Sequence, residues 1–253
     1  MTLLECLFVL AAGVGAGTIN TVVGSGTLVT FPVLLGVGYA PITANVSNSL
    51  GLVPGSLSGA HGYRRELAGQ RRRVIRYGSA SLLGGASGAG LLFVLPASAF
   101  EAIVPAMIAL ALTLVVFQPR LARALAARRH PDAPPREGGA GTFLLGYLTG
   151  VYGGYFGAAQ GIILLAIFGL TLDEEMQRVN ALKNVLAMIV NLVAGIVFLF
   201  VAHVAWEAVA LLAVGSAAGG QLGARIGRRL PPRVLRAVIV VVGVVAIVQL
   251  LTR

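Results

Sequence analysis

Charged residues are scarce in this chain. They make up 11% of its 253 residues, whereas hydrophobic residues make up 57%. A soluble globular domain carries roughly a quarter charged residues, so the composition excludes that class. Several apolar runs reach the roughly 20 residues that a helix needs to cross a bilayer. Because these runs are continuous and a spanning backbone must satisfy its own hydrogen bonds, we expect an all-α polytopic protein of the cell (inner) membrane.

Cysteine and the common catalytic motifs are also missing. The single cysteine, Cys6, excludes an internal disulfide and a metal site made of several cysteines. The sequence contains no P-loop, no HExxH and no GxSxG on a strand-to-helix turn. We therefore expect no enzyme activity, no cofactor, no metal site and no direct use of ATP.

Lysine occurs once, at Lys183, and the eighteen other basic residues are arginines. Most arginines lie between the apolar runs, and the formal net charge is +10. Arginines in short loops set the orientation of membrane helices, and no basic domain interleaved with aromatic residues is present. We therefore expect the lipid bilayer as a partner, and no nucleic acid.

The chain contains one unit written twice. GVGAGTINTVVGSG, from Gly13, matches GYLTGVYGGYFGAA, from Gly146, without gaps at three glycines. The same alignment, with a two-residue insertion, extends to LLGGASGAGLLFVLP against AAGGQLGARIGRRLP. Such a shared order over about 85 residues indicates a duplication. We expect a first membrane repeat over residues 1–118, a basic and proline-rich cytoplasmic linker over 119–139, and a second membrane repeat over 140–253.

Hydropathy and helix breakers predict five helical segments in each repeat. The segments lie near 3–23, 27–38, 42–61, 74–94 and 100–117, and near 141–156, 160–170, 174–203, 206–224 and 234–251. The second segment of each repeat is too short to span comfortably. With the segment before it, it is expected to form a broken or re-entrant glycine-rich hairpin, followed by about three transmembrane helices.

The arginine distribution predicts that the two repeats have opposite orientations. The loop after 42–61 holds six arginines between Arg64 and Arg76, whereas its counterpart around VAHVAWEAVA holds none. The next loop reverses this bias, because LPASAFEAI has no arginine and ARIGRRLPPRVLR has five. By the positive-inside rule the repeats are inverted, as in many secondary transporters whose substrate site lies at the repeat interface. Parallel repeats with a chance arginine pattern are the alternative.

The glycine-rich hairpins resemble those of the TauE/SafE family, the sulfite exporter-like membrane permeases. The resemblance lies in GAGTINTVVGSGTLVTFPVLLGVGYAPITANVSNSL, in its partial echo GVYGGYFGAAQGIILLAIFGLTLDEEMQRVNALKNV, and in the ending GARIGRRLP. It covers nearly the whole chain, and the second hairpin is the looser match. The family implies a multi-helix permease for small anions such as sulfite or organosulfonates. Sulfite enters only through this resemblance.

Lys183 lies inside an apolar run, RVNALKNVLAMIVNLVAGIVFLF. The sequence TLDE at Thr171–Glu174 resembles a capping box at the start of that helix. At 1.5 Å per residue, Lys183 then lies about 14 Å along it. A charge at that depth should face a cavity or a partner, and no acidic residue holds a matching deep position. We expect a mobile anion as the partner; the alternatives are snorkelling to the interface or loss of the proton.

Polar residues at helical spacing occur in both repeats and can form a substrate site. Residues at i, i+3 and i+4 share one helix face. The two sets are Asn180, Lys183 and Asn184 in the second repeat, and Asn45, Asn48 and Ser49 in the first. Amide and hydroxyl groups can donate to sulfite or sulfonate oxygens. Hydrogen bonding between helices is the alternative role.

The hairpin glycines provide further candidate anion ligands. Helices broken at glycine expose N-terminal N–H groups that attract anions. The candidates are Asn20, Gly24, Ser25, Gly26 and Thr27 in the first hairpin, and Gly157, Gln160 and Gly161 in the second. The alternative is close packing of small residues.

These observations predict a secondary permease that moves a small anion, sulfite or an organosulfonate, by alternating access at the repeat interface. A passive anion channel and a non-transporting membrane assembly subunit are the alternatives. A coupling proton or sodium ion and a homodimer are both compatible with this prediction.

Overall fold

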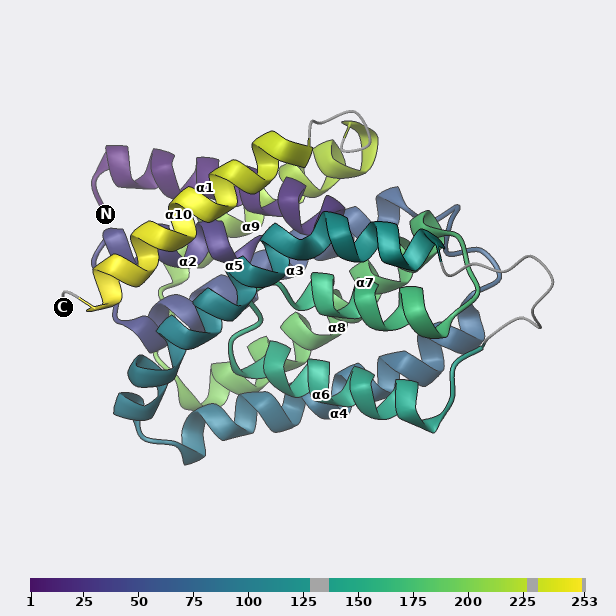
Figure 1. The fold of residues 1–253 in the computed structure, drawn as a ribbon. Coiled ribbons are helices and arrows are strands. Elements are labelled where there is room, and N and C mark those ends of the chain that lie inside the picture. The colour runs from purple at the N-terminus through teal and green to yellow at the C-terminus, as the bar shows by residue number, and fades with distance from the viewer. Residues whose placement is uncertain (128–136, 227–231, 252–253) are drawn as a thin grey trace.

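The computed structural model describes residues 1–127, 137–226 and 232–251, and Figure 1 shows their arrangement as a bundle of helices. Within these residues the only β-type pairing is an isolated bridge between Glu137 and Leu172, so the all-α prediction is confirmed. The helices are α1 (Leu3–Val22), α2 (Thr27–Gly36), α3 (Pro41–Gly62), α4 (Arg71–Val94), α5 (Ala97–Ala127), α6 (Ala140–Tyr155), α7 (Gln160–Thr171), α8 (Met176–Val201), α9 (Trp206–Ile226) and α10 (Pro232–Leu251).

Most helix boundaries lie within three residues of their predicted positions, but α5 is ten residues longer at its C-terminal end. It continues to Ala127, although the sequence predicted an end near residue 117. Residues 120–127, RLARALAA, consist of alanine, leucine and arginine, which are strong helix formers. The helix therefore extends into the segment that was predicted as a linker. The central part of that segment, 128–136, lies outside the described residues.

The predicted capping box at Thr171–Glu174 is wrong. The Thr171 hydroxyl donates to the Ile167 carbonyl inside α7, at 2.8 Å, and α8 begins at Met176. The Glu174 carboxylate is held instead by two guanidinium groups, those of Arg73 and Arg178. Lys183 therefore lies about 10 Å along α8, at 1.5 Å per residue.

The surface of the bundle is rich in large apolar side chains. Phe200 is 83% exposed, Val94 80% and Leu3 78%. Within the described residues, four helices, α1, α4, α5 and α8, are long and apolar enough to cross a membrane. Such side chains favour lipid over water, so the protein is a multi-pass membrane protein.

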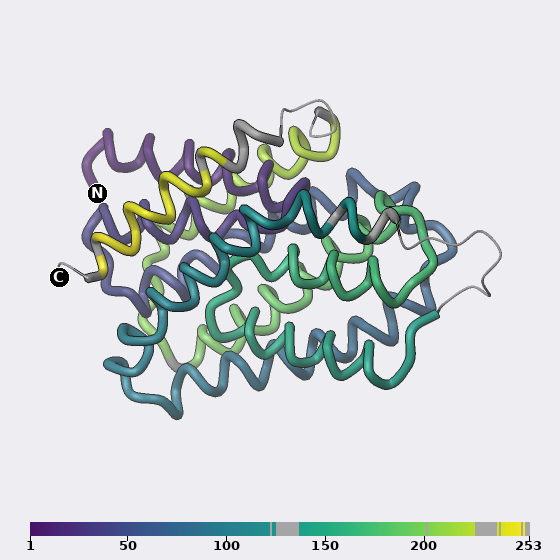
Figure 2. Tube along the Cα trace, viewed as in Figure 1, coloured from purple at the N-terminus to yellow at the C-terminus, as the bar shows by residue number. Residues whose placement is uncertain are grey.

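The first helix of each half packs along a helix of the other half. α1 packs along α9, and its counterpart α6 packs along α4. α3 also contacts α9, as α8 contacts α4, and α3 and α8 contact each other. Glycine allows the closest contacts: a Cβ at Gly17 would lie 2.2 Å from the Ser216 carbonyl oxygen, and one at Gly84 2.2 Å from that of Tyr147. In Figure 2, α1 begins at the same end of the bundle at which α10 ends.

An ion-pair cluster ties α4 to the beginnings of α6 and α8. Arg73 donates to both carboxylate oxygens of Glu137, at 3.0 and 2.7 Å, and also to Glu174. Arg178 pairs with Glu174 at 2.8 Å, and its backbone carbonyl accepts from the Gln70 amide at 2.9 Å. The hydrogen bonds from Arg73 lower the pKa of Glu137. These arginines are therefore neutralised by acidic partners.

Candidate functional site

Polar side chains of α8 hold the C-terminal end of α1. The Lys183 ammonium donates to the backbone carbonyls of Asn20, at 2.8 Å, and Thr21, at 3.3 Å. The side-chain amides of Asn180 and Asn184 donate to the Thr21 carbonyl at 3.2 and 3.3 Å. The last carbonyls of a helix lack intrahelical donors and carry partial negative charge. One cation and two amides therefore stabilise this helix end.

The partners of Lys183 correct one step of the sequence interpretation. The side chain is fully buried, and its ammonium is bonded to the protein rather than left without a protein partner. Two carbonyls solvate the charge but do not neutralise it, and no carboxylate of the described residues forms an ion pair with Lys183. An ammonium has three N–H groups, of which two are used here. When Lys183 is protonated, a net positive charge and one donor therefore remain for a further partner.

The first half contains a related but unequal arrangement on α3. The Asn45 amide donates to the Tyr155 carbonyl at the end of α6, at 2.9 Å, as Asn180 does at the end of α1. Asn48, at the position equivalent to Lys183, turns instead to the start of α2. Its amide donates to the Thr27 hydroxyl at 3.3 Å, and its carbonyl accepts from the Thr30 hydroxyl. Asn45 and Asn180 therefore have the same role in the two halves, whereas Asn48 and Lys183 do not.

Two glycine-containing connectors, residues 23–26 between α1 and α2 and residues 156–159 between α6 and α7, meet beside Lys183. Gly24 and Gly157 have φ of +89° and +78°, in the left-handed region that favours glycine. The Gly161 N–H donates to the Gly24 carbonyl at 3.1 Å. A Cβ at Gly24 would lie 2.5 Å from the Gly161 Cα, and one at Gly161 3.0 Å from the Lys183 Cδ. The site thus joins the connectors of both halves to the buried lysine.

Both connectors have backbone N–H groups that are free within the described residues. In the second, Gln160 donates to the Gly157 carbonyl at 3.3 Å and Gly161 to Gly24, whereas Ala158 and Ala159 have no acceptor. In the first, the N–H groups of Ser25, Gly26 and Thr27 have no acceptor among the described residues. Free donors for an anion therefore lie in both connectors.

Unpartnered polar atoms gather in the same segments. Five buried side-chain atoms here have no hydrogen-bond partner within the described parts of the chain: Ser25 Oγ, Asn45 Oδ1, Tyr155 OH, Gln160 Nε2 and Asn180 Oδ1. All five residues are at most 7% exposed. A buried polar atom left unsatisfied costs about 1–3 kcal/mol, so these atoms favour the presence of a polar ligand or water. The described residues contain no group of three or more metal-ligating side chains.

The remaining predicted site residues have other contacts. The Ser49 hydroxyl donates to the Asn45 carbonyl in its own helix, at 3.0 Å. The Asn20 amide donates to the Ser56 hydroxyl at 3.2 Å, so its backbone carbonyl is the group that meets Lys183. Gly26 precedes α2 and packs on α1.

Tyr155 is a site residue that the sequence analysis missed. Its hydroxyl is one of the unpartnered atoms and its carbonyl accepts from Asn45. In the repeat alignment this position corresponds to Val22. The alignment of a polar aromatic residue in one repeat with a valine in the other was the available signal.

The chain is similar to several known proteins along nearly its full length. It is 26% identical over 237 residues to "Probable membrane transporter protein YfcA" of Escherichia coli (strain K12), which covers 93% of this chain and 86% of that protein. It is 26% identical over 245 residues to a "Probable membrane transporter protein" of Haemophilus influenzae, with 95% and 91% covered. Residues 9–250 match the family "Sulfite exporter TauE/SafE". The chain therefore belongs to the TauE/SafE family and is a membrane transporter.

Proposed function

We propose that this transporter is a secondary permease for a small oxoanion, sulfite or an organosulfonate. The observation that carries the proposal is Lys183, a fully buried ammonium whose described partners are neutral carbonyls. A buried charge is costly unless it is paired. An anion that arrives from solution supplies the missing negative charge and accepts a hydrogen bond from the third N–H group of Lys183.

Neutral donors near the lysine complete the proposed anion site. The Gln160 amide nitrogen and the Ser25 hydroxyl are buried without partners among the described residues. Sulfite and sulfonate groups present several acceptor oxygens, which suit a set of N–H and O–H donors. The remaining proposed ligands are the amides of Asn180, Asn184, Asn45 and Asn48, and the backbone N–H groups of Ser25, Gly26 and Thr27, whereas the N–H groups of Gly24, Gly157 and Gly161 already donate within the protein. Because the charge is supplied by one lysine, we expect selectivity for anions over zwitterions.

Alternating access between two inverted repeats is the mechanism that we propose. The matching helix pairs, α1 with α9 and α6 with α4, support a twofold relation between the halves. The bond between Gly161 and Gly24 joins the two connectors at the proposed site. Rocking one half against the other would open the site to each side in turn, as inverted-repeat transporters do.

Counterflow in liposomes tests the function. We expect purified protein to catalyse saturable exchange of sulfite or sulfoacetate, because alternating access moves one bound anion per cycle. The panel is sulfite, sulfate, thiosulfate, sulfoacetate, taurine and acetate, with an imposed proton or sodium gradient in separate runs. Empty liposomes are the control. Anion flux without saturation or counterflow would indicate a channel, and no flux with a folded protein would favour a non-transporting subunit.

Single-cysteine labelling tests the inverted orientation. In a Cys6→Ser background, we expect Ala68→Cys to react from the cytoplasmic side, and Ser98→Cys and His203→Cys from the opposite side. Ala68 lies in the arginine-rich loop after α3, and His203 in the equivalent loop after α8. Membrane-impermeant maleimide is added to intact and to opened cells. Reaction of Ala68→Cys and His203→Cys from the same side would exclude inverted repeats.

A further inference from the structure

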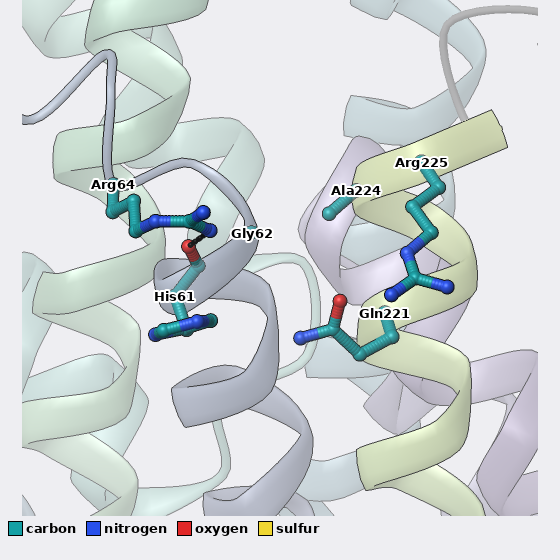
Figure 3. Close-up of a pocket in the computed structure, with 6 residues that line it drawn as sticks. All are labelled: His61, Gly62, Arg64, Gln221, Ala224 and Arg225. Carbon is teal, nitrogen blue, oxygen red and sulfur yellow. Dashed lines mark hydrogen bonds between the residues drawn. The ribbon is translucent and has the colours of Figure 1, made fainter.

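A second polar pocket lies outside the connector site, between the C-terminal ends of α3 and α9. Its volume is about 380 Å³, and its lining residues come from both halves of the chain: His61, Gly62, Arg64, Gln221, Ala224 and Arg225. Figure 3 shows the His61–Arg64 segment facing α9 across the pocket. We refer to these six residues as the α3–α9 pocket.

The charge of the α3–α9 pocket is positive and uncompensated. Arg64 and Arg225 line it, and none of its lining residues is acidic. Neither arginine forms an ion pair with a carboxylate of the described residues, whereas Arg73 and Arg178 both do. Arg64 and Arg225 therefore have no acidic partner in the described parts of the chain, as is also true of Arg71 and Arg72.

Two donors of the pocket, Arg64 and Gln221, are held in place by backbone contacts. The Arg64 guanidinium donates to the His61 carbonyl at 3.3 Å, and the Gln221 amide donates to the Ser58 carbonyl at 3.3 Å. In Figure 3 the Gln221 side chain points towards His61, and the Arg225 guanidinium lies beside Gln221.

Close helix packing fixes the spacing of the two walls. A Cβ at Gly62 would lie 2.2 Å from the Ala224 Cβ, so α3 and α9 can approach this closely only with glycine at residue 62. Arg64 lies just after the end of α3, and Arg225 lies in the last turn of α9. The two arginines are thereby held at helix ends in direct contact, one from each half of the chain.

We propose that the α3–α9 pocket binds a small tetrahedral oxoanion, which is bridged by Arg64 and Arg225. A guanidinium presents paired N–H donors that match the oxygens of sulfate or phosphate groups. A free anion and the phosphate of an anionic lipid headgroup share this chemistry. The pocket is a separate site from that of Lys183, and its occupation would join α3 of one half to α9 of the other.

Anion binding by purified protein tests the proposal. We expect Arg64→Gln/Arg225→Gln to weaken the binding of sodium sulfate by at least about tenfold, the loss expected for charge-assisted hydrogen bonds. The matched control is Arg71→Gln/Arg72→Gln, which removes the same charge from a separate exposed groove at the start of α4. Calorimetric titration in detergent at constant ionic strength gives the affinities. Gln221→Glu, which adds a carboxylate to the pocket, should weaken binding in the same way.

A lipid arm separates the two sources of the anion. Each protein is placed in nanodiscs that contain phosphatidylglycerol, and the retained phospholipid is counted after extraction into detergent. Loss of sulfate binding in the pocket variants alone identifies a free-anion site. Unchanged sulfate binding with loss of retained phosphatidylglycerol in the same variants identifies a headgroup site. Equal behaviour of the pocket variants and the Arg71/Arg72 control in both measurements overturns the proposal. Both measurements are independent of counterflow, so the failure of one proposal is distinguishable from failure of the other.

Discussion

Replacing Lys183 by glutamine should reduce anion counterflow by about 10- to 100-fold while the protein still folds. Glutamine keeps an amide donor for the carbonyls at the end of α1, which accept from Lys183 at 2.8 and 3.3 Å. It removes the charge, and a hydrogen bond to a charged group is worth about 1.5–3 kcal/mol, which corresponds to this loss. The measurement is counterflow of the best anion of the panel, with wild-type protein beside the variant.

A second substitution separates charge from hydrogen bonding at this position. Lys183→Met removes both, whereas Lys183→Gln removes the charge alone. If the lysine only caps α1, glutamine should retain near wild-type exchange and methionine should not. If the charge binds the anion, both variants should lose exchange. Thermal unfolding of both variants in detergent shows whether a loss of activity comes from a loss of structure.

Gly24→Ala should destabilise the protein by about 2–5 kcal/mol, because left-handed strain of about 1–2 kcal/mol adds to overpacking of about 1–3 kcal/mol. The added Cβ would lie 2.5 Å from the Gly161 Cα, and the residue has φ of +89°. Backbone atoms of α7 must then move, and the Gly161–Gly24 bond and the wall beside Lys183 move with them. Thermal unfolding in detergent measures the effect.

Two other glycines of the chain serve as matched controls. Gly38 has φ of +104°, and a Cβ added there would have no atom within 4 Å, so Gly38→Ala reports the conformational strain alone. Gly15 has neither a positive φ nor a neighbour within 4 Å of an added Cβ, so Gly15→Ala should be nearly neutral. We expect the loss of stability to follow the order Gly24, Gly38, Gly15. Equal losses at Gly24 and Gly38 would show that the contact between the connectors contributes nothing.

Local sequence was enough to predict the membrane class and nearly all the helix boundaries. Hydropathy, proline and glycine act over a few residues, so the predicted segments agree with the observed helices at most ends. The two exceptions have different causes. Arg73 and Arg178 hold the Glu174 carboxylate, to which the sequence assigned a capping role. α5 continues past its predicted end because the local preference of alanine, leucine and arginine for helix was underestimated. The duplication stays a prediction, which rests on the comparison of the chain with itself.

The groups that Lys183 meets could not be predicted without the packing of the helices. The sequence identified a lone buried lysine flanked by asparagines, but the carbonyls that it binds belong to Asn20 and Thr21, more than 160 positions away. No local pattern links residues at that separation, and a helix end becomes an acceptor only where packing brings a donor to it. The same is true of the contact between Gly24 and Gly161. Hydropathy alone predicts a charge buried in the membrane, whereas the packing of α8 against the end of α1 sets where that charge lies and which carbonyls of the protein it contacts.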